Sequence, residues 1–231
     1  MISNKWGMNI KIKYIVSDLN GTIVDAMPIY TRVFCDVVKR HAGIESPKIA
    51  SYSIAATGTP WDEQFSHILQ DHKLPKEEVP KMMDEFCSVI YNERYSLFPA
   101  AEELLKLFNL KGYKVFITSG SGTGPMLKRL YEVGVFPYID FLIGFDIYKK
   151  GIKHIQMLGE KVGLSLEQFA QQSVYFGDGP GDMRLAKEAG IFAIGVAQTV
   201  SPDLLKEAGA DLVIEKIGDA LEIDWGKIEL E

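Results

Sequence analysis

The chain has 231 residues, which is enough for one large domain or for a core with a smaller insert. Hydrophobic residues make up 47% and charged residues 24%, and the net charge of -6 argues against a nucleic-acid binder with a broad basic surface. No apolar run approaches the roughly 18 residues of a membrane span, and no signal peptide is evident, so we expect a cytoplasmic protein without membrane partners.

The first predicted strand, Ile10–Ser17, ends in the turn Asp18-Leu19-Asn20-Gly21-Thr22. Its apolar run is typical of a buried parallel strand. Such a strand can aim the Asp18 carboxylate at a phosphorus atom while the turn at Gly21 and Thr22 holds the phosphoryl oxygens. The alternative is an aspartate that only stabilises a turn at the strand end.

Helical spacing replaces the strand pattern between residues 28 and 95, where no convincing strand occurs. We therefore predict an all-helical cap domain, residues 25–96, inserted into a core domain made of residues 1–24 and 97–231. The two cysteines, Cys35 and Cys87, lie in apolar helical patterns and indicate buried thiols rather than a disulfide.

One loop of the predicted cap, residues 57–62, precedes an amphipathic helix and is the candidate specificity loop. We expect Thr59 and Trp61 to contact the substrate there, because cap residues that face a cleft select the substrate and exclude water. A simple helix start with Trp61 in the cap interior is the alternative.

Beyond Pro99, helices and strands alternate, which predicts an α/β fold with a doubly wound parallel sheet. The expected helices are Ala100–Leu110, Pro125–Val133, Ile152–Val162, Asp182–Ala189 and Pro202–Ala208, and the expected strands are Lys114–Thr118, Tyr138–Ile143, Val174–Phe176, Ile191–Val196 and Leu212–Ile214. Ligands of such sheets bind at the carboxyl ends of the strands, which draws attention to Asp18, Thr118, Asp146 and Asp178.

The second strand of the core ends in Thr118-Ser119-Gly120, where hydroxyls and loop N–H groups can bind a phosphoryl oxygen. The glycines that follow fail the dinucleotide-binding pattern, because Pro125 stands in place of the third glycine. Lys149 and Lys150 follow the next strand, and either can neutralise charge at the reaction centre or lie on a solvated surface.

The segment Gly177-Asp178-Gly179-Pro180-Gly181-Asp182 follows a buried strand and places two carboxylates among glycines. Mg²⁺ prefers one or two carboxylates together with water and phosphate oxygens, so this spacing suits a magnesium site. A turn followed by a helix cap is the alternative.

Taken in this order, the four elements resemble the haloacid dehalogenase superfamily. Its motifs are Asp-x-Asp-Gly-Thr, a strand ending in Thr or Ser, a Lys, and Gly-Asp-x-x-x-Asp. The resemblance covers nearly the whole chain. The helical insert and the stretch 98–105 are similar to the phosphoglycolate phosphatase and β-phosphoglucomutase branch, which implies a Rossmann-like core under a helical cap.

The resemblance implies a role for each matching residue. Asp18 would be the phosphoryl-accepting nucleophile and a Mg²⁺ ligand, the carbonyl of Asn20 a second ligand, Asp178 a direct ligand, and Asp182 a direct or water-mediated one. Thr118 would hydrogen-bond the phosphoryl group. Lys150 would stabilise charge, with Lys149 as the alternative.

Asn20 departs from the family pattern, which has a second aspartate there that protonates the leaving oxygen and later activates water. An amide can do neither, although its backbone carbonyl can still bind Mg²⁺. General acid–base catalysis contributes roughly 10²–10⁴-fold, so we expect a loss of that order for alkyl phosphates. The asparagine is an engineered inactivating change, or a natural feature of a slow or regulatory protein, or it is compensated by another acid.

The resemblance implies a Mg²⁺-dependent phosphatase that acts on a small phosphorylated metabolite through an aspartyl-phosphate. The alternative is a catalytically impaired or regulatory phosphate-binding protein, which the replacement of the acid–base aspartate by Asn20 suggests. A phosphomutase, a phosphonatase, a dehalogenase and a receiver-type signalling domain fit the sequence less well. The identity of the metabolite and the oligomeric state are not indicated.

Overall fold

The computed structural model describes residues 12–225. Six strands form one sheet in the order β3-β2-β1-β4-β5-β6, and every neighbouring pair is parallel. The strands are β1 (Tyr14–Ser17), β2 (Lys114–Thr118), β3 (Phe141–Ile143), β4 (Ser173–Gly177), β5 (Phe192–Val196) and β6 (Leu212–Ile214). The doubly wound α/β fold predicted from the sequence is therefore confirmed.

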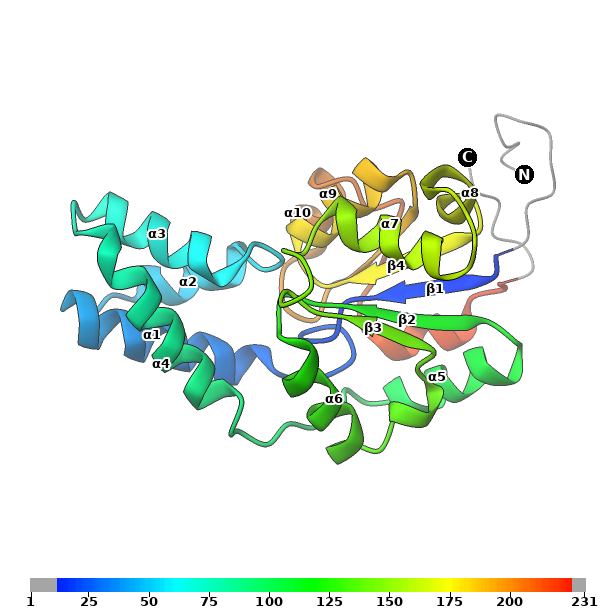
Figure 1. Ribbon diagram of the computed structural model, residues 1–231, viewed down its shortest axis with the longest axis horizontal. Coiled ribbons are helices and arrows are strands. Elements are labelled where there is room, and N and C mark those ends of the chain that lie inside the picture. The colour runs from blue at the N-terminus through cyan, green and yellow to red at the C-terminus, as the bar shows by residue number, and fades with distance from the viewer. Residues whose placement is uncertain (1–11, 226–231) are drawn as a thin grey trace.

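Helices cover both faces of this sheet, as right-handed crossovers between parallel strands require (Figure 1). One face carries α7 (Ile152–Lys161), α8 (Leu166–Ala170), α9 (Pro180–Ala189) and α10 (Pro202–Glu207). The other carries α5 (Ala101–Leu110), α6 (Thr123–Glu132) and the short 3₁₀ helices η2 (Phe136–Tyr138) and η3 (Ile217–Glu222). Each face buries its own hydrophobic cluster.

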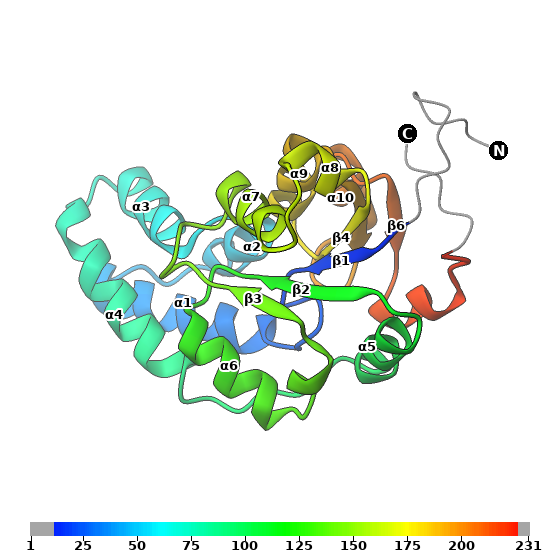
Figure 2. The same cartoon turned by 45° about the vertical axis from the view of Figure 1, so that its right-hand side comes forward.

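Four helices lie beyond the carboxyl ends of the strands and form the cap (Figures 1 and 2). They are α1 (Met27–Ala42), α2 (Pro47–Ala55), α3 (Trp61–Asp71) and α4 (Val79–Ile90), with a 3₁₀ turn, η1 (Lys76–Glu78), before α4. Burial of Tyr30, Val33 and Val37 at helical spacing fixes the inner face of α1. The helical insert is confirmed, while the domain limits at 24/25 and 96/97 stay a prediction.

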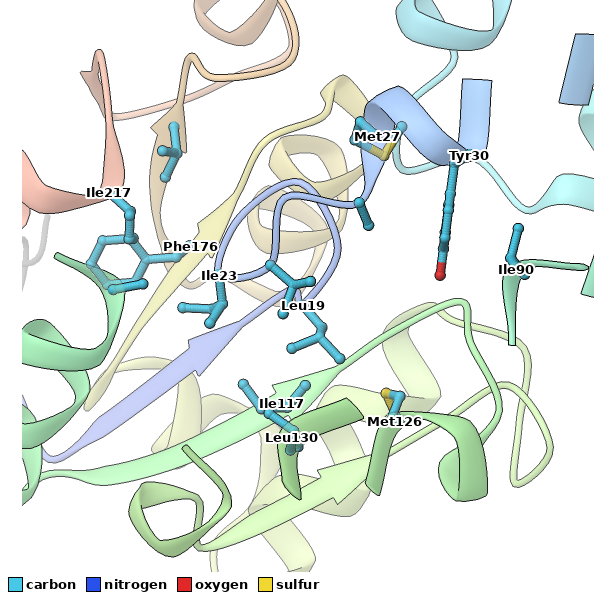
Figure 3. Packing of buried hydrophobic residues seen from close by; sticks show 14 of the residues in the cluster. Leu19, Ile23, Met27, Tyr30, Ile90, Ile117, Met126, Leu130, Phe176 and Ile217 are labelled. Carbon is cyan, nitrogen blue, oxygen red and sulfur yellow. The ribbon is translucent and has the colours of Figure 1, made fainter. Parts of the chain in front are cut away.

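Aromatic rings fill the interior of the cap. The Phe34 and Phe65 rings stack with their centroids 4.5 Å apart, and the Trp61 and Phe86 centroids lie 4.7 Å apart. Burying one such side chain stabilises the fold by roughly 1.5–3 kcal/mol. Buried residues continue without a break from Tyr30 and Ile90 to the sheet, so the cap rests on the same hydrophobic cluster as the core (Figure 3).

The chain enters and leaves the cap through two adjacent segments. Val24 and Leu97 form an antiparallel bridge, and the Asp25 amide donates to the Ser96 carbonyl over 2.9 Å. Backbone pairing at this crossing ties the position of α1 to that of the segment before α5.

Several element boundaries differ from prediction for local reasons. β1 begins at Tyr14, where pairing with its neighbours begins, while the predicted start at Ile10 lies outside the described residues. The helix predicted from Pro125 begins at Thr123, because the Asp146 carboxylate accepts hydrogen bonds from the Thr123 amide over 2.7 Å and from its hydroxyl over 2.8 Å. The 3₁₀ turn η2 shortens the following strand to Phe141–Ile143.

The sequence analysis missed α8. This single-turn helix is held by a capping box in which the Gln168 amide donates to the Ser165 hydroxyl and the Ser165 amide donates to the Gln168 side chain. Among the described residues, no helix is long and apolar enough to cross a membrane.

Candidate active site

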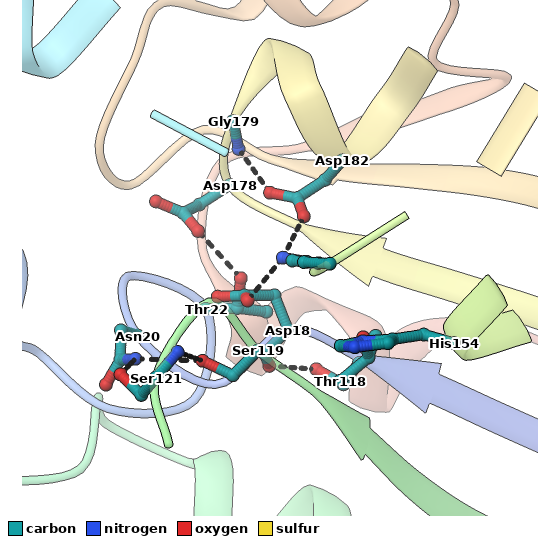
Figure 4. A network of polar contacts seen from close by, with 12 residues as sticks. Asp18, Asn20, Thr22, Thr118, Ser119, Ser121, His154, Asp178, Gly179 and Asp182 are labelled. Atoms are coloured by element: carbon teal, nitrogen blue, oxygen red, sulfur yellow. Dashed lines mark hydrogen bonds and ion pairs between the residues drawn. The ribbon is translucent and has the colours of Figure 1, made fainter. Parts of the chain in front are cut away.

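Four distant segments meet at the carboxyl edge of the sheet, next to the cap (Figure 4). β1 pairs with β2 and with β4 in registers that place Ser17 beside Ile117 and Phe176. The turns after these three strands therefore lie side by side, and they carry Asp18, Ser119 and Asp178. The segment before α7 adds a lysine to the same place.

Lys150 lies between two carboxylates. Its ammonium nitrogen is 2.6 Å from Asp18 Oδ1 and 2.6 Å from Asp182 Oδ1, and all three side chains are at most 8% exposed. Lys149 instead points to the cap, where it pairs with Glu63 over 2.6 Å and with Asp62 over 3.5 Å. The geometry therefore brings Lys150, and not Lys149, to the predicted nucleophile.

Burial and neighbouring charge shape the ionisation of this cluster. Burial raises the pKa of Asp18 to about 6, although the ammonium of Lys150 works in the opposite direction. Burial, followed by the charges of Asp18 and Asp182, raises the pKa of Asp178 well above its usual value. Burial alone would lower the pKa of Lys150, but Asp18 and Asp182 hold it well above its usual value. The cluster thus brings three carboxyl groups together with one ammonium.

The carboxylates of Asp178 and Asp182 are held in different ways. Asp182 receives hydrogen bonds from the Tyr175 hydroxyl over 3.1 Å and from the Gly179 amide over 3.2 Å, in addition to Lys150. Asp178 Oδ1 accepts a bond from the Thr22 hydroxyl over 2.9 Å, while Oδ2 is buried with no hydrogen-bond partner among the described residues. A buried carboxylate oxygen of this kind calls for a cation.

Mg²⁺ fits this donor set. Asp18 and Asp178 supply the one or two carboxylates that Mg²⁺ takes from a protein. The unpartnered Oδ2 atom of Asp178 is available as a ligand. Within residues 12–225, no three histidine, cysteine or acidic side chains form a group able to hold a metal by themselves. Water and phosphate oxygens would complete the usual six-coordinate shell.

Gly21 is required by its contact with Asp178. Its φ of +93° lies in the left-handed region, and a Cβ there would come within 2.1 Å of Asp178 Oδ2. Gly21 and Thr22 do not line the cavity described below. The structure thus places these two predicted substrate-binding residues against the metal-binding candidate instead.

The two hydroxyls predicted at the end of β2 point in different directions. Thr118 is fully buried, and its hydroxyl bonds the His154 Nδ1 atom over 2.7 Å. Burial lowers the pKa of His154, so this imidazole stays neutral. Ser119 and Gly120 line the cavity instead. Successive side chains of a strand alternate between faces, so only one of two adjacent hydroxyls can face a cleft.

Asn20 is fixed by a buried cation that the sequence analysis missed. The Asn20 amide nitrogen donates to Ser119 Oγ over 3.2 Å and to Ser121 Oγ over 3.1 Å, and its oxygen accepts from Arg129 Nη1. The same Nη1 atom donates to the Tyr30 hydroxyl over 2.8 Å. This network fixes which end of the amide faces the serines.

Arg129 itself has neutral neighbours. Its guanidinium lies 3.9 Å from the centroid of the Tyr95 ring and donates over 3.5 Å to the Ile90 carbonyl. Its Nε atom is buried and has no partner in the described part of the chain. Arg129 follows Met126 by three positions and precedes Leu130 by one, both of them buried, and this place on an apolar stripe was the available signal.

A cavity of about 310 Å³ separates the sheet edge from the cap, and Asp18, Asn20, Lys150 and Asp178 line its core side. The predicted specificity residues Thr59 and Trp61 line the cap side. Beside it, the cap loop lies directly on the first turn of α9. The Gly181 amide donates over 3.4 Å to the Thr57 carbonyl, and a Cβ on Gly181 would come within 2.5 Å of the Gly58 backbone.

This combination of a doubly wound core, a helical cap and a lysine-bridged aspartate cluster defines a hydrolase of the haloacid dehalogenase type. The sequence model of the haloacid dehalogenase-like hydrolase family matches residues 12–190, and the chain belongs to that family.

The chain is also similar to named relatives. It is 26% identical over 216 residues to glycerol-1-phosphate phosphohydrolase 2 of Saccharomyces cerevisiae, a match that covers 90% of this chain and 84% of the yeast protein. It is 24% identical to a phosphoglycolate phosphatase of Caulobacter vibrioides, covering 89% and 87%. A haloacid dehalogenase-like hydrolase from Streptococcus pneumoniae shares the fold, with a TM-score of 0.75 at 22% identity over 91% of this chain and 97% of that one.

Proposed function

We propose that the chain hydrolyses small phosphomonoesters through an aspartyl-phosphate on Asp18. The observation that carries this proposal is the buried contact of 2.6 Å between Lys150 Nζ and Asp18 Oδ1 at the edge of the cavity. A lysine there stabilises the carboxylate in its attacking form and the charge that develops on the phosphoryl oxygens. Relatives named as phosphatases support the same class of reaction.

In the first step, an Asp18 carboxylate oxygen attacks the phosphorus, the ester P–O bond breaks, and the leaving oxygen takes its proton from water. In the second step, water attacks the phosphorus of the aspartyl-phosphate and releases inorganic phosphate. Ser119 Oγ accepts from the Asn20 amide, which leaves its own hydrogen to donate to the phosphoryl group in both steps. Mg²⁺, when bound by Asp18 and Asp178, would neutralise the charge of that group.

Asn20 shapes the kinetics that we expect. Because an amide cannot activate water, breakdown of the aspartyl-phosphate is slowed, and the phosphoenzyme should accumulate with a burst of released alcohol. The test is hydrolysis of a broad phosphomonoester panel with Mg²⁺, combined with intact-protein mass spectrometry for one added phosphoryl group. The Asp18→Asn variant is the control that should show neither signal.

A second candidate function is a phosphate-binding or regulatory protein with little turnover, and the fixed, non-ionisable Asn20 favours it. The same panel separates the two. If this chain and its Asn20→Asp variant both stay inactive and neither acquires a phosphoryl group, the phosphatase proposal is rejected and the binding function stands.

A further inference from the structure

The cavity has two chemically different walls. Its core wall carries the charged cluster around Asp18. Its cap wall carries apolar and aromatic side chains from α1, the loop before α3, the start of α3, α4 and the loop after β3, namely Met27, Tyr30, Pro60, Trp61, Met83 and Phe145. The polar residues Thr57, Thr59, Asp62 and Gln64 complete this side of the lining. Whatever is attached to the phosphoryl group must lie against this wall.

Positive charge on the described lining is already neutralised. The basic residues that line the cavity are Lys149 and Lys150, and both are paired with carboxylates. Lys149 is held by Glu63 and Asp62, and Asp62 itself lines the cavity, so the mouth gains no net positive charge. A second carboxylate or phosphate on the substrate would find no free cation to bind.

One of the polar side chains on the cap side is the amide of Gln64. The Gln64 nitrogen donates to the Thr59 carbonyl over 2.8 Å and to the Ala56 carbonyl over 3.4 Å, which leaves Gln64 Oε1 buried without a partner. An unpaired acceptor oxygen disfavours a nearby anion, and it can accept a hydrogen bond from a donor on an uncharged group.

From these observations we propose that the preferred substrate is a phosphate monoester of an uncharged phenol, rather than one that carries a second acidic group. This rests on the proposed phosphatase function and narrows it. A cavity of roughly 150 Å³ suffices for one benzene ring, so about 310 Å³ holds a phosphoryl group and a single ring. Asn20 supports the same class, because a phenolate departs without the proton that an amide cannot give.

Two non-hydrolysable ligands test this selectivity directly. Benzylphosphonate and phosphonoacetate both carry a phosphonate on a methylene group, and they differ in a phenyl ring against a carboxylate. With Mg²⁺ present, isothermal titration should show benzylphosphonate binding about ten- to a hundredfold more tightly, the gain from burying one ring. Equal or tighter binding of phosphonoacetate, or no binding of either, overturns the inference.

The ligands separate this inference from the proposed function, because neither can be turned over. A chain that prefers benzylphosphonate but hydrolyses no phosphomonoester keeps the aromatic selectivity and loses the phosphatase function. A chain that hydrolyses phosphoglycolate or pyrophosphate at least as efficiently as phenyl phosphate, and prefers phosphonoacetate, keeps the function and loses the selectivity.

Two pairs of variants locate the ring. Met83→Lys adds a cation to the cap wall and should raise phosphonoacetate affinity about tenfold relative to benzylphosphonate, while Met83→Leu should leave the ratio unchanged. Trp61→Ala should weaken benzylphosphonate but not methylphosphonate, and Trp61→Phe should keep most of the affinity. Because Trp61 also packs on Phe86, circular dichroism must show that Trp61→Ala is folded. A ratio unmoved by Met83→Lys places the ring elsewhere and overturns the proposal.

Discussion

The core wall and the cap wall of the cavity are built on opposite principles. The core wall buries Asp178 beside a lysine that is paired with Asp18 and Asp182, and its order depends on ion pairs and hydrogen bonds (Figure 4). The cap wall is backed by packed aromatic rings. Reaction chemistry is therefore concentrated in the part of the fold that is costly to desolvate, while selection is left to a wall that apolar substitutions can reshape.

The largest expected effect comes from removing the attacking carboxylate on the core wall. Asp18→Asn should lower kcat by about 10⁴-fold or more, because an asparagine cannot form the aspartyl-phosphate. Steady-state kinetics with Mg²⁺ on an aryl phosphate measure it. Residual activity within tenfold of the parent chain would mean that Asp18 is not the nucleophile.

The next effect concerns Asn20 and has the opposite sign. Asn20→Asp should speed hydrolysis of alkyl phosphates by roughly 10²–10⁴-fold and of aryl phosphates by less, because only poor leaving groups need a proton. Arg129 lies against this side chain and should hold the new carboxyl ionised, so breakdown of the phosphoenzyme should gain more than its formation.

Rapid-quench kinetics separate those two steps, and Asn20→Ala is the control that removes the amide without adding a base. Equal acceleration of alkyl and aryl esters by Asn20→Asp would contradict a role in proton transfer.

Lys150→Met should reduce kcat by about 10²–10³-fold, the usual loss when one group that stabilises transition-state charge is removed. It should also destabilise the metal-free protein by roughly 3–5 kcal/mol, because Asp18 and Asp182 would face each other without a buried counter-ion. Urea unfolding with and without Mg²⁺ measures the second effect, and Mg²⁺ should recover part of it. An unchanged unfolding midpoint would show that the lysine is not needed to balance the cluster.

The pH dependence of Mg²⁺ binding should follow Asp18. Its pKa of about 6 in the folded chain lies above its ordinary value of 3.8, so the folded state favours the protonated carboxyl. That contribution to stability is complete below the ordinary value and is lost as the pH rises through about 6. Mg²⁺ binds the ionised form, so its stabilisation should be largest above pH 6, about 2.7 kcal/mol at roughly a hundred times Kd.

Thermal unfolding with Mg²⁺ or a chelator, on either side of that pH, provides the measurement. Equal Mg²⁺-induced shifts of Tm at both pH values would exclude the carboxylates of Asp18 and Asp178 as the binding site.

The smallest effect belongs to the contact between the two walls. Lys149→Met removes the pair with Glu63, in which both side chains are 54% exposed, and should change the free energy of unfolding by less than about 1 kcal/mol. Lys149→Met is a matched control for Lys150→Met, because it makes the same change at the adjacent residue. A loss as large as that of Lys150→Met would mean that any charge change in this segment disturbs the site.

Much of this architecture follows from the sequence. Apolar runs that end in Asp18 and Asp178 predict buried strands, and helical spacing predicts the cap, because burial imposes both periods. The same burial hides other details. β2 is buried on both faces, so its pattern cannot tell which hydroxyl, of Thr118 or Ser119, faces the cleft. The sequence also cannot tell whether Lys149 or Lys150 reaches Asp18, because that depends on the conformation of the turn before α7.

Arg129 escaped prediction for a different reason. Its place on the apolar stripe of α6 indicates burial, but its partners Asn20 and Tyr30 are about a hundred positions away in the chain, so no local pattern identifies what it binds. Likewise, the role of Thr22 as a donor to Asp178 depends on a turn whose geometry is set by Gly21. Long-range polar contacts of this kind leave no periodic trace in a sequence.

The backbones of Gly58 in the cap and Gly181 in the core are in direct contact, and the contact leaves no room for a side chain on either residue. A side chain introduced at Gly58 or Gly181 would hold the cap loop away from α9. The segment that carries Asp178 and Asp182 therefore also sets how closely the cap approaches the carboxylates.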